Sequence, residues 1–125
     1  MISAKTSLLA GALLALLSVS LGAFGAHALK DLLAANGRLS TYETAVQYQF
    51  YHALGLLLIG VLAYQFPNLK TDWVSGLMLI GILIFSGSLY ILCLTGIRWL
   101  GAITPIGGAA FIAAWGLLAW KLLKI

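Results

Sequence analysis

The sequence predicts an all-α polytopic membrane protein with four transmembrane helices in a single bundle. Hydrophobic residues make up 62% of the chain and charged residues 8%, whereas soluble domains carry roughly 25% charged residues. The mean hydropathy of +1.06 means that the outer surface must face lipid. Finally, the apolar residues fall into four runs, each long enough to cross a hydrocarbon core of about 30 Å. We expect spans at about residues 6–29, 41–66, 73–95 and 105–123, in one domain over residues 1–125.

The first apolar run follows Lys5. A secretory signal peptide is the alternative interpretation, because Ala26-His27-Ala28 matches an A-x-A cleavage site. The run exceeds twenty residues and three more spans follow it, so we expect it to be retained as a transmembrane helix. Gly22 and Ala26 are four residues apart and form a small-xxx-small face, which allows close approach of a neighbouring helix.

Residues 30–39 form the longest polar connection and predict a short interfacial helix that ends at the Asn-Gly pair at 36–37. Ser40 and Glu43 then match the S-x-x-E capping box. This pattern predicts that the second transmembrane helix begins near Thr41 and that Glu43 serves as a capping carboxylate. The Pro-Asn pair at 67–68 predicts the end of this helix.

The third span begins at Trp73, an aromatic residue of the kind found at membrane boundaries. Its middle contains the small residues Ser-Gly-Ser at 86–88, which favour close packing against another helix.

The fourth span is predicted to follow an ordered, turn-rich segment over residues 96–103. Thr104 and Pro105 are typical of a helix start, with Thr104 as the N-cap and Pro105 at the first helical position. Trp115 and Trp120 lie towards the exit of this helix, with Lys121 and Lys124 beyond them.

The charged residues indicate a membrane rather than a nucleic-acid partner. The net charge is +4, but the basic residues stand singly at the ends of apolar runs and form no stripe that would follow phosphates. Four spans place both termini on one side of the bilayer, and the slightly greater number of basic residues there predicts that both termini are cytoplasmic. That side holds Lys5, Lys70, Lys121 and Lys124, and the other holds Lys30, Arg38 and Arg98.

Four sequence motifs together resemble a family of small bacterial membrane proteins grouped as a domain of unknown function, with YgdD-like and YwdK-like members and a related animal transmembrane family. They are GAFGAHAL (22–29), TYETAVQYQFYHALGLL (41–57), FSGSLY (85–90) and LGAITPIGG (100–108). The resemblance covers nearly the whole chain. It implies a four-helix protein of the bacterial inner membrane, and it implies no activity.

His52 is the strongest candidate for a functional residue, because an ionisable group near mid-membrane needs a partner or a water-filled cavity. It lies about 18 Å from the expected helix start. Tyr48 and Gln49 precede it by one turn and can bond its ring. The alternative is a structural role, in which Tyr48, Ser86, Ser88 or Tyr90 holds a neutral imidazole. The candidate polar site comprises His52, Tyr48, Gln47, Ser86, Ser88 and Tyr90.

Glu43, His27 and Arg98 form a second candidate group, at the entrance to this polar region or as helix caps. Arg98 is interpreted as an interfacial anchor, or alternatively as a partner for Glu43 or for an anionic headgroup. His27 and His52 differ in membrane depth, and Glu43 lies about 180° round the helix from His52. We therefore expect neither a metal nor haem, and no cofactor.

No catalytic motif is found: the chain lacks GxSxG, Walker A, HExxH and CxxC patterns. Its three acidic residues all lie near membrane boundaries, so we expect no enzyme. Two hypotheses remain. The first is a non-enzymatic structural or accessory component of the inner membrane that acts through helix–helix association, as a homo-oligomer or with another membrane subunit. The second is a small transporter or channel with a polar path around His52. The first requires paired polar groups, and the second requires groups that converge on a cavity.

Overall fold

A computed structural model describes residues 2–125 and is helical almost throughout. Four of its helical segments are long and apolar enough to cross a membrane, which confirms the predicted fold class. The helix bounds lie within two residues of those expected from the apolar runs. The elements are α1 (Ala4–His27), α2 (Lys30–Ala35), α3 (Leu39–Gln65), the 3₁₀ helix η1 (Pro67–Leu69), α4 (Asp72–Thr95), the 3₁₀ helix η2 (Arg98–Ala102) and α5 (Thr104–Leu122).

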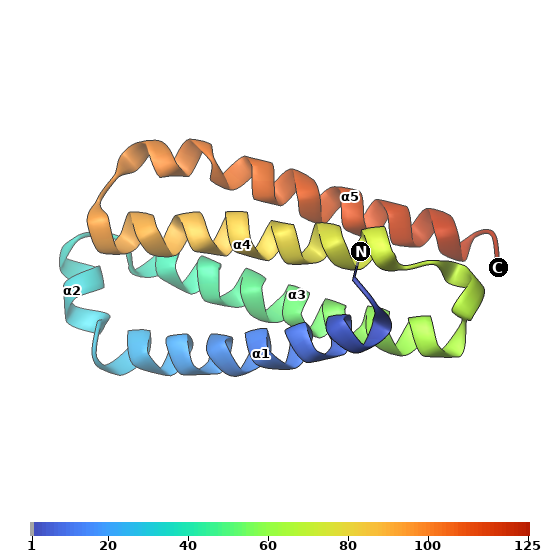
Figure 1. Cartoon of the computed structure of the whole chain (residues 1–125). Helices are drawn as coiled ribbons and strands as arrows, with labels where there is room; N and C mark the ends of the chain where they lie inside the picture. The colour runs from blue at the N-terminus through green and yellow to red at the C-terminus, as the bar shows by residue number, and fades with distance from the viewer. Residues whose placement is uncertain (1) are drawn as a thin grey trace.

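The long helices pack in the order in which they occur along the chain. Helix α1 packs mainly against α3, α3 against α4, and α4 against α5. Figure 1 shows α1 and α5 on opposite sides of the bundle with α3 and α4 between them, and the short α2 at one end. Helices α3 and α4 are therefore the central pair, and they contain a larger buried share than α1 and α5.

Small residues bring α1 and α3 into backbone contact. A Cβ atom added to Gly11 would lie 2.8 Å from the carbonyl oxygen of Ala53, so only glycine fits at this crossing. One turn earlier, the Ser7 hydroxyl donates a 2.7 Å hydrogen bond to the carbonyl oxygen of Leu56. In the predicted small-residue pair, Gly22 lies against Val46 of α3. Close approach of backbones is a common way to join helices in lipid, where burial of apolar surface supplies little driving force.

Helices α4 and α5 meet in the same way. A Cβ atom at Gly107 would lie within 2.8 Å of the backbone of Phe85, so the two helix backbones touch there. Apolar side chains from α3, α4 and α5 form the hydrophobic core next to this crossing. The buried members of this core are Leu56, Ile59, Val74, Met78, Ile82, Phe111, Ala114 and Leu118.

The prediction of a capping box at Ser40 and Glu43 is wrong. Helix α2 ends in a Schellman motif, in which Gly37 has a φ of 68° and the Arg38 amide donates to the carbonyl oxygen of Leu33 at 2.8 Å. The chain enters α3 directly after this motif, so Arg38 is the N-cap and no side chain caps the helix. Ser40 is thus already helical, and its carbonyl accepts a bond from the Thr44 hydroxyl.

Helix α5 also begins one residue earlier than predicted. Thr104 is its first helical residue and Ile103 is the N-cap, so the assignment of Thr104 as N-cap is wrong. Its hydroxyl bonds to Ser88 Oγ on α4 at 2.6 Å and to the carbonyl oxygen of Leu100 at 3.3 Å. The Thr104 side chain therefore joins two helices instead of capping one.

Substitution of Gly107 by alanine tests the α4–α5 contact. The new methyl group would collide with backbone atoms, which cannot rotate away, so we expect a loss of about 1–3 kcal/mol in the free energy of unfolding. Gly116→Ala is the matched control on the same helix, because nothing lies within 4 Å of a Cβ atom there. Denaturant titration in detergent micelles, followed by circular dichroism, measures both. Equal stability of the two variants would contradict the contact.

Candidate functional site

His52 lies in the middle of α3 and is 6% exposed. Trp115 of α5 donates its indole N–H to His52 Nε2 at 3.1 Å. Because an indole can only donate, Nε2 is the acceptor and the ring proton lies on Nδ1. Nδ1 is 2.7 Å from the carbonyl oxygen of Tyr48 and donates to it. Both ring nitrogens of a neutral imidazole are therefore paired within the protein.

Aromatic rings surround this imidazole. Phe111 stacks on it with 3.5 Å between ring centroids and 12° between ring planes. Tyr48 is stacked at 6.0 Å from the imidazole, and it stacks in turn on Phe85 of α4 at 4.6 Å. The cluster joins α3, α4 and α5. The backbones of α3 and α5 are not packed closely, so these two helices meet through their side chains.

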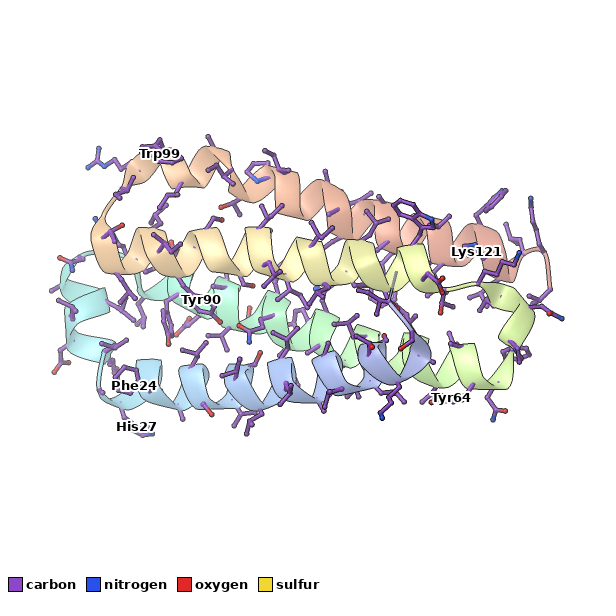
Figure 2. All side chains as sticks on the ribbon, viewed as in Figure 1. Phe24, His27, Tyr64, Tyr90, Trp99 and Lys121 are labelled. Atoms are coloured by element: carbon purple, nitrogen blue, oxygen red, sulfur yellow. The ribbon has the colours of Figure 1, made fainter. Side chains whose placement is uncertain are left out.

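A second polar group is centred on Gln49, one turn before His52 and 3% exposed. The Tyr90 hydroxyl of α4 donates to Gln49 Oε1 at 2.6 Å, and Gln49 Nε2 donates to the carbonyl oxygen of Leu14 in α1 at 3.0 Å. Figure 2 shows Tyr90 extending from α4 towards α3. The Tyr90 ring also packs edge-on against Tyr42 at 5.6 Å. One carboxamide therefore connects three helices.

The buried serines make separate contacts between helices. Ser86 Oγ donates to the carbonyl oxygen of Ala45 at 2.7 Å, and Ser75 Oγ donates to Ser7 Oγ at 3.0 Å. Ser18 Oγ is the one buried side-chain oxygen or nitrogen without a partner in residues 2–125. The carbonyl of Leu14, the usual acceptor for a serine four residues later, receives the bond from Gln49 instead.

The predicted polar site is therefore divided into separate pairs. Of its six residues, His52 and Tyr48 are the one pair that is hydrogen-bonded within residues 2–125; Ser86, Ser88 and Tyr90 bond to other partners. Ser86, Ser88 and Tyr90 are therefore wrong as partners of the imidazole. Gln49 does not bond the His52 ring either, because its amide is already used by Leu14 and Tyr90. Gln47 is exposed on the outer face of α3.

The second candidate group lies on the surface. Glu43, His27 and Arg98 are all exposed, and Figure 2 shows His27 on the outward side of α1. Glu43 and Gln47 line a shallow groove of about 150 Å³ between α1 and α3. Within residues 2–125, no three His, Cys, Asp or Glu side chains are close enough to share a metal ion.

Trp115 is the main residue that sequence reasoning missed. The sequence places it towards the exit of the fourth span, but it lies against His52 and close to Gly55, where a Cβ atom would be 3.4 Å from its ring. The available signal was its position: it occurs midway along α5, well before the helix end at Leu122. A tryptophan inside a span needs an acceptor for its N–H, and His52 was the obvious buried acceptor.

Tyr90→Phe tests the bond to Gln49. Loss of the hydroxyl leaves Gln49 Oε1 without its donor in a buried site, so we expect the free energy of unfolding to fall by about 1 kcal/mol. The control is Tyr64→Phe, because Tyr64 is 63% exposed and its hydroxyl makes no hydrogen bond within residues 2–125. Both are compared with the parent protein by thermal unfolding in one detergent. The assignment would be contradicted if Tyr90→Phe and Tyr64→Phe were equally stable.

Comparisons with known proteins agree with this architecture. The family described as "Protein of unknown function (DUF423)" matches residues 21–108. A UPF0382 membrane protein of Staphylococcus saprophyticus is 50% identical over 121 residues, covering 97% of this chain and 99% of the relative. The UPF0382 membrane protein YwdK of Bacillus subtilis is 49% identical over 112 residues, covering 89% and 90% respectively. No solved structure matches. The chain belongs to the DUF423 family, and like these relatives it is an integral membrane protein whose family has no assigned activity.

Proposed function

We propose that the protein is a non-enzymatic structural component of the bacterial cytoplasmic membrane, which acts by self-association through its lipid-facing surface. The observation that carries this proposal is the pairing of the interior polar groups. His52 has both ring nitrogens occupied, and the Gln49 amide has both its oxygen and its nitrogen bonded. Groups used in this way hold helices together.

A transporter or channel would use the same residues differently. A polar path requires side chains that present free donors or acceptors to a shared cavity. Here Ser86 and Tyr90 each bond to their own acceptor on α3, Ala45 and Gln49 respectively, and aromatic rings flank the imidazole. The geometry therefore favours structural cohesion over transport.

Gln47 is a polar side chain on the outer surface of the bundle. Gln47 lies about 12 Å from the start of α3, which is about 40 Å long, so it is within the hydrocarbon layer when the helix is centred in the bilayer. It is exposed, and its carboxamide makes no hydrogen bond within residues 2–125. An unpaired carboxamide facing lipid is unfavourable, and a contact with another protein surface removes this penalty.

A second copy of the chain fits this surface. A carboxamide both donates and accepts, so two copies of Gln47 related by a two-fold axis satisfy each other. Gln47 lines the groove between α1 and α3 together with Gly22 and Ala26. These small residues let the backbone of a second molecule approach closely, as small residues do at helix interfaces in lipid.

The proposed orientation places both termini in the cytoplasm. Helix α1 starts and α5 ends at the same end of the bundle (Figure 1). This end carries four of the seven basic residues, and the positive-inside rule favours the side with more Lys and Arg.

Gln47→Leu tests self-association directly. Loss of the carboxamide removes the proposed pair, so we expect dimerisation to weaken by about tenfold. Single-molecule photobleaching of fluorescently labelled protein in lipid vesicles, over a range of protein-to-lipid ratios, gives the dimer fraction. Gln65→Leu is the control, since Gln65 is an exposed glutamine on the same helix outside this groove.

The parent protein and Gln65→Leu should dimerise alike. A parent protein that stays monomeric at every ratio would overturn the proposal. A parent dimer that Gln47→Leu leaves unchanged would place the interface elsewhere and overturn the role assigned to this groove.

A further inference from the structure

The end of the bundle that bears the two termini contains a second groove, separate from the polar interior. It lies where α3 ends, between η1 and the last turn of α5, and its volume is about 600 Å³. Figure 1 shows these segments close together at one end of the molecule, and Figure 2 labels Lys121 there. The polar side chains that line it are Gln65, Asn68, Lys70, Lys121 and Lys124, with Trp120 beside them.

The lining of this groove suits an anion bearing several oxygens. Three ammonium groups and two carboxamides supply hydrogen-bond donors. No Asp or Glu side chain is among the residues that line it, and Ile125, the last residue of the sequence, also lies in the lining. Lysines are common ligands for phosphate groups, as point charges with three donors each. A volume of about 600 Å³ is also within the range of roughly 300–1,000 Å³ that is usual for small-molecule sites.

The backbone at Lys70 adds an independent observation. Its φ of 51° is the one positive φ of a non-glycine residue in residues 2–125. A glycine adopts this left-handed conformation without strain, whereas a side chain with a Cβ atom does not. The strained position thus carries a lysine that lines the groove. Binding of an anion by its ammonium group would explain why a lysine occupies this position instead of a glycine.

The position of the groove identifies the class of anion. It lies at the ends of α3 and α5, where the spans leave the hydrocarbon layer and headgroups begin. Trp120 is 52% exposed and Phe66, another lining residue, is 44% exposed. Lys124 Nζ lies 3.6 Å from the centroid of the Trp120 ring. Exposed aromatic rings next to ammonium groups match a ligand that is charged at one end and apolar at the other.

We infer that this groove binds the phosphate headgroup of an anionic phospholipid. The lysines contact the phosphate oxygens, and the exposed rings of Phe66 and Trp120 lie beside the glycerol and the first part of the acyl chains. The shared chemistry is a phosphate ester, which a soluble phosphorylated compound also offers, and the experiment distinguishes these two sources. This inference does not depend on self-association through Gln47.

Native mass spectrometry of the purified protein with added phosphatidylglycerol or phosphatidylcholine measures binding. We expect phosphatidylglycerol to bind more tightly than phosphatidylcholine. Replacing Lys70, Lys121 and Lys124 together by glutamine should weaken phosphatidylglycerol binding about fivefold for each lysine, or about a hundredfold in total. Lys5→Gln is the control, because Lys5 is predicted to lie on the same membrane side but does not line the groove.

Lys70→Gly separates binding from stability. Glycine relieves the left-handed backbone, so we expect this variant to be at least as stable as the parent protein and yet to bind phosphatidylglycerol about fivefold more weakly. Equal binding of phosphatidylglycerol by the parent and the triple variant would overturn the inference, as would an equal loss in Lys5→Gln. Displacement of the lipid by soluble glycerol phosphate at a similar concentration would overturn the lipid assignment and point to a soluble phosphate compound.

Discussion

A polar group inside a bilayer has no water to bond with, and this constraint organises the whole molecule. In the hydrocarbon layer, an unpaired donor or acceptor is satisfied only by another part of the protein. Most buried polar side chains of this chain accordingly bond to a different helix. Gln49 connects α3 to α1 and α4, His52 connects α3 to α5, and Ser86 connects α4 to α3. These bonds fix which helix faces meet, because a rotated helix would leave several groups unpaired at once.

Two kinds of packing make those bonds possible. At Gly11 and Gly107 the backbones of neighbouring helices touch, and short side chains such as Ser7 then reach carbonyl oxygens across the interface. Between α3 and α5 the backbones stay apart, and large rings from Tyr48, Phe111 and Trp115 fill the space. The long helices pack in the order in which they occur along the chain, and long helices that are not consecutive make few contacts.

The separation of functions follows the same physical logic. Most interior polar groups join helices, with Ser18 Oγ as the exception, and we therefore look to the surface for interactions with other molecules. Two surface grooves are lined by polar side chains that make no hydrogen bond within residues 2–125: the groove between α1 and α3 with Gln47, and the lysine-lined groove at the ends of α3 and α5. One faces the hydrocarbon layer and suits a protein partner. The other faces the headgroups and suits a lipid.

The number and length of the helices could be predicted from the sequence, because apolar run length directly reflects membrane thickness. The end of α2 at Gly37 was also predictable, since glycine is the residue that adopts a left-handed C-cap without strain. The predicted capping box is wrong because the turn at Gly37 determines where α3 starts. The four residues of the motif do not show how the preceding helix ends. The partners of His52 depend on how three helices cross, which no single stretch of sequence specifies.

Paired polar groups hold the helices together only if the interior is closed to water, and thiol accessibility measures this most directly. In a Cys93→Ser background, cysteine replaces either Ser86, which is 1% exposed, or Asn36, which lies in the exposed turn after α2. Both variants are treated with a membrane-impermeant maleimide in opened membrane vesicles. Because reaction requires an accessible thiolate, we predict that the cysteine at position 86 reacts at least about a hundredfold more slowly than the one at position 36. Rates within about tenfold of each other would show that water reaches the interior and would contradict the account.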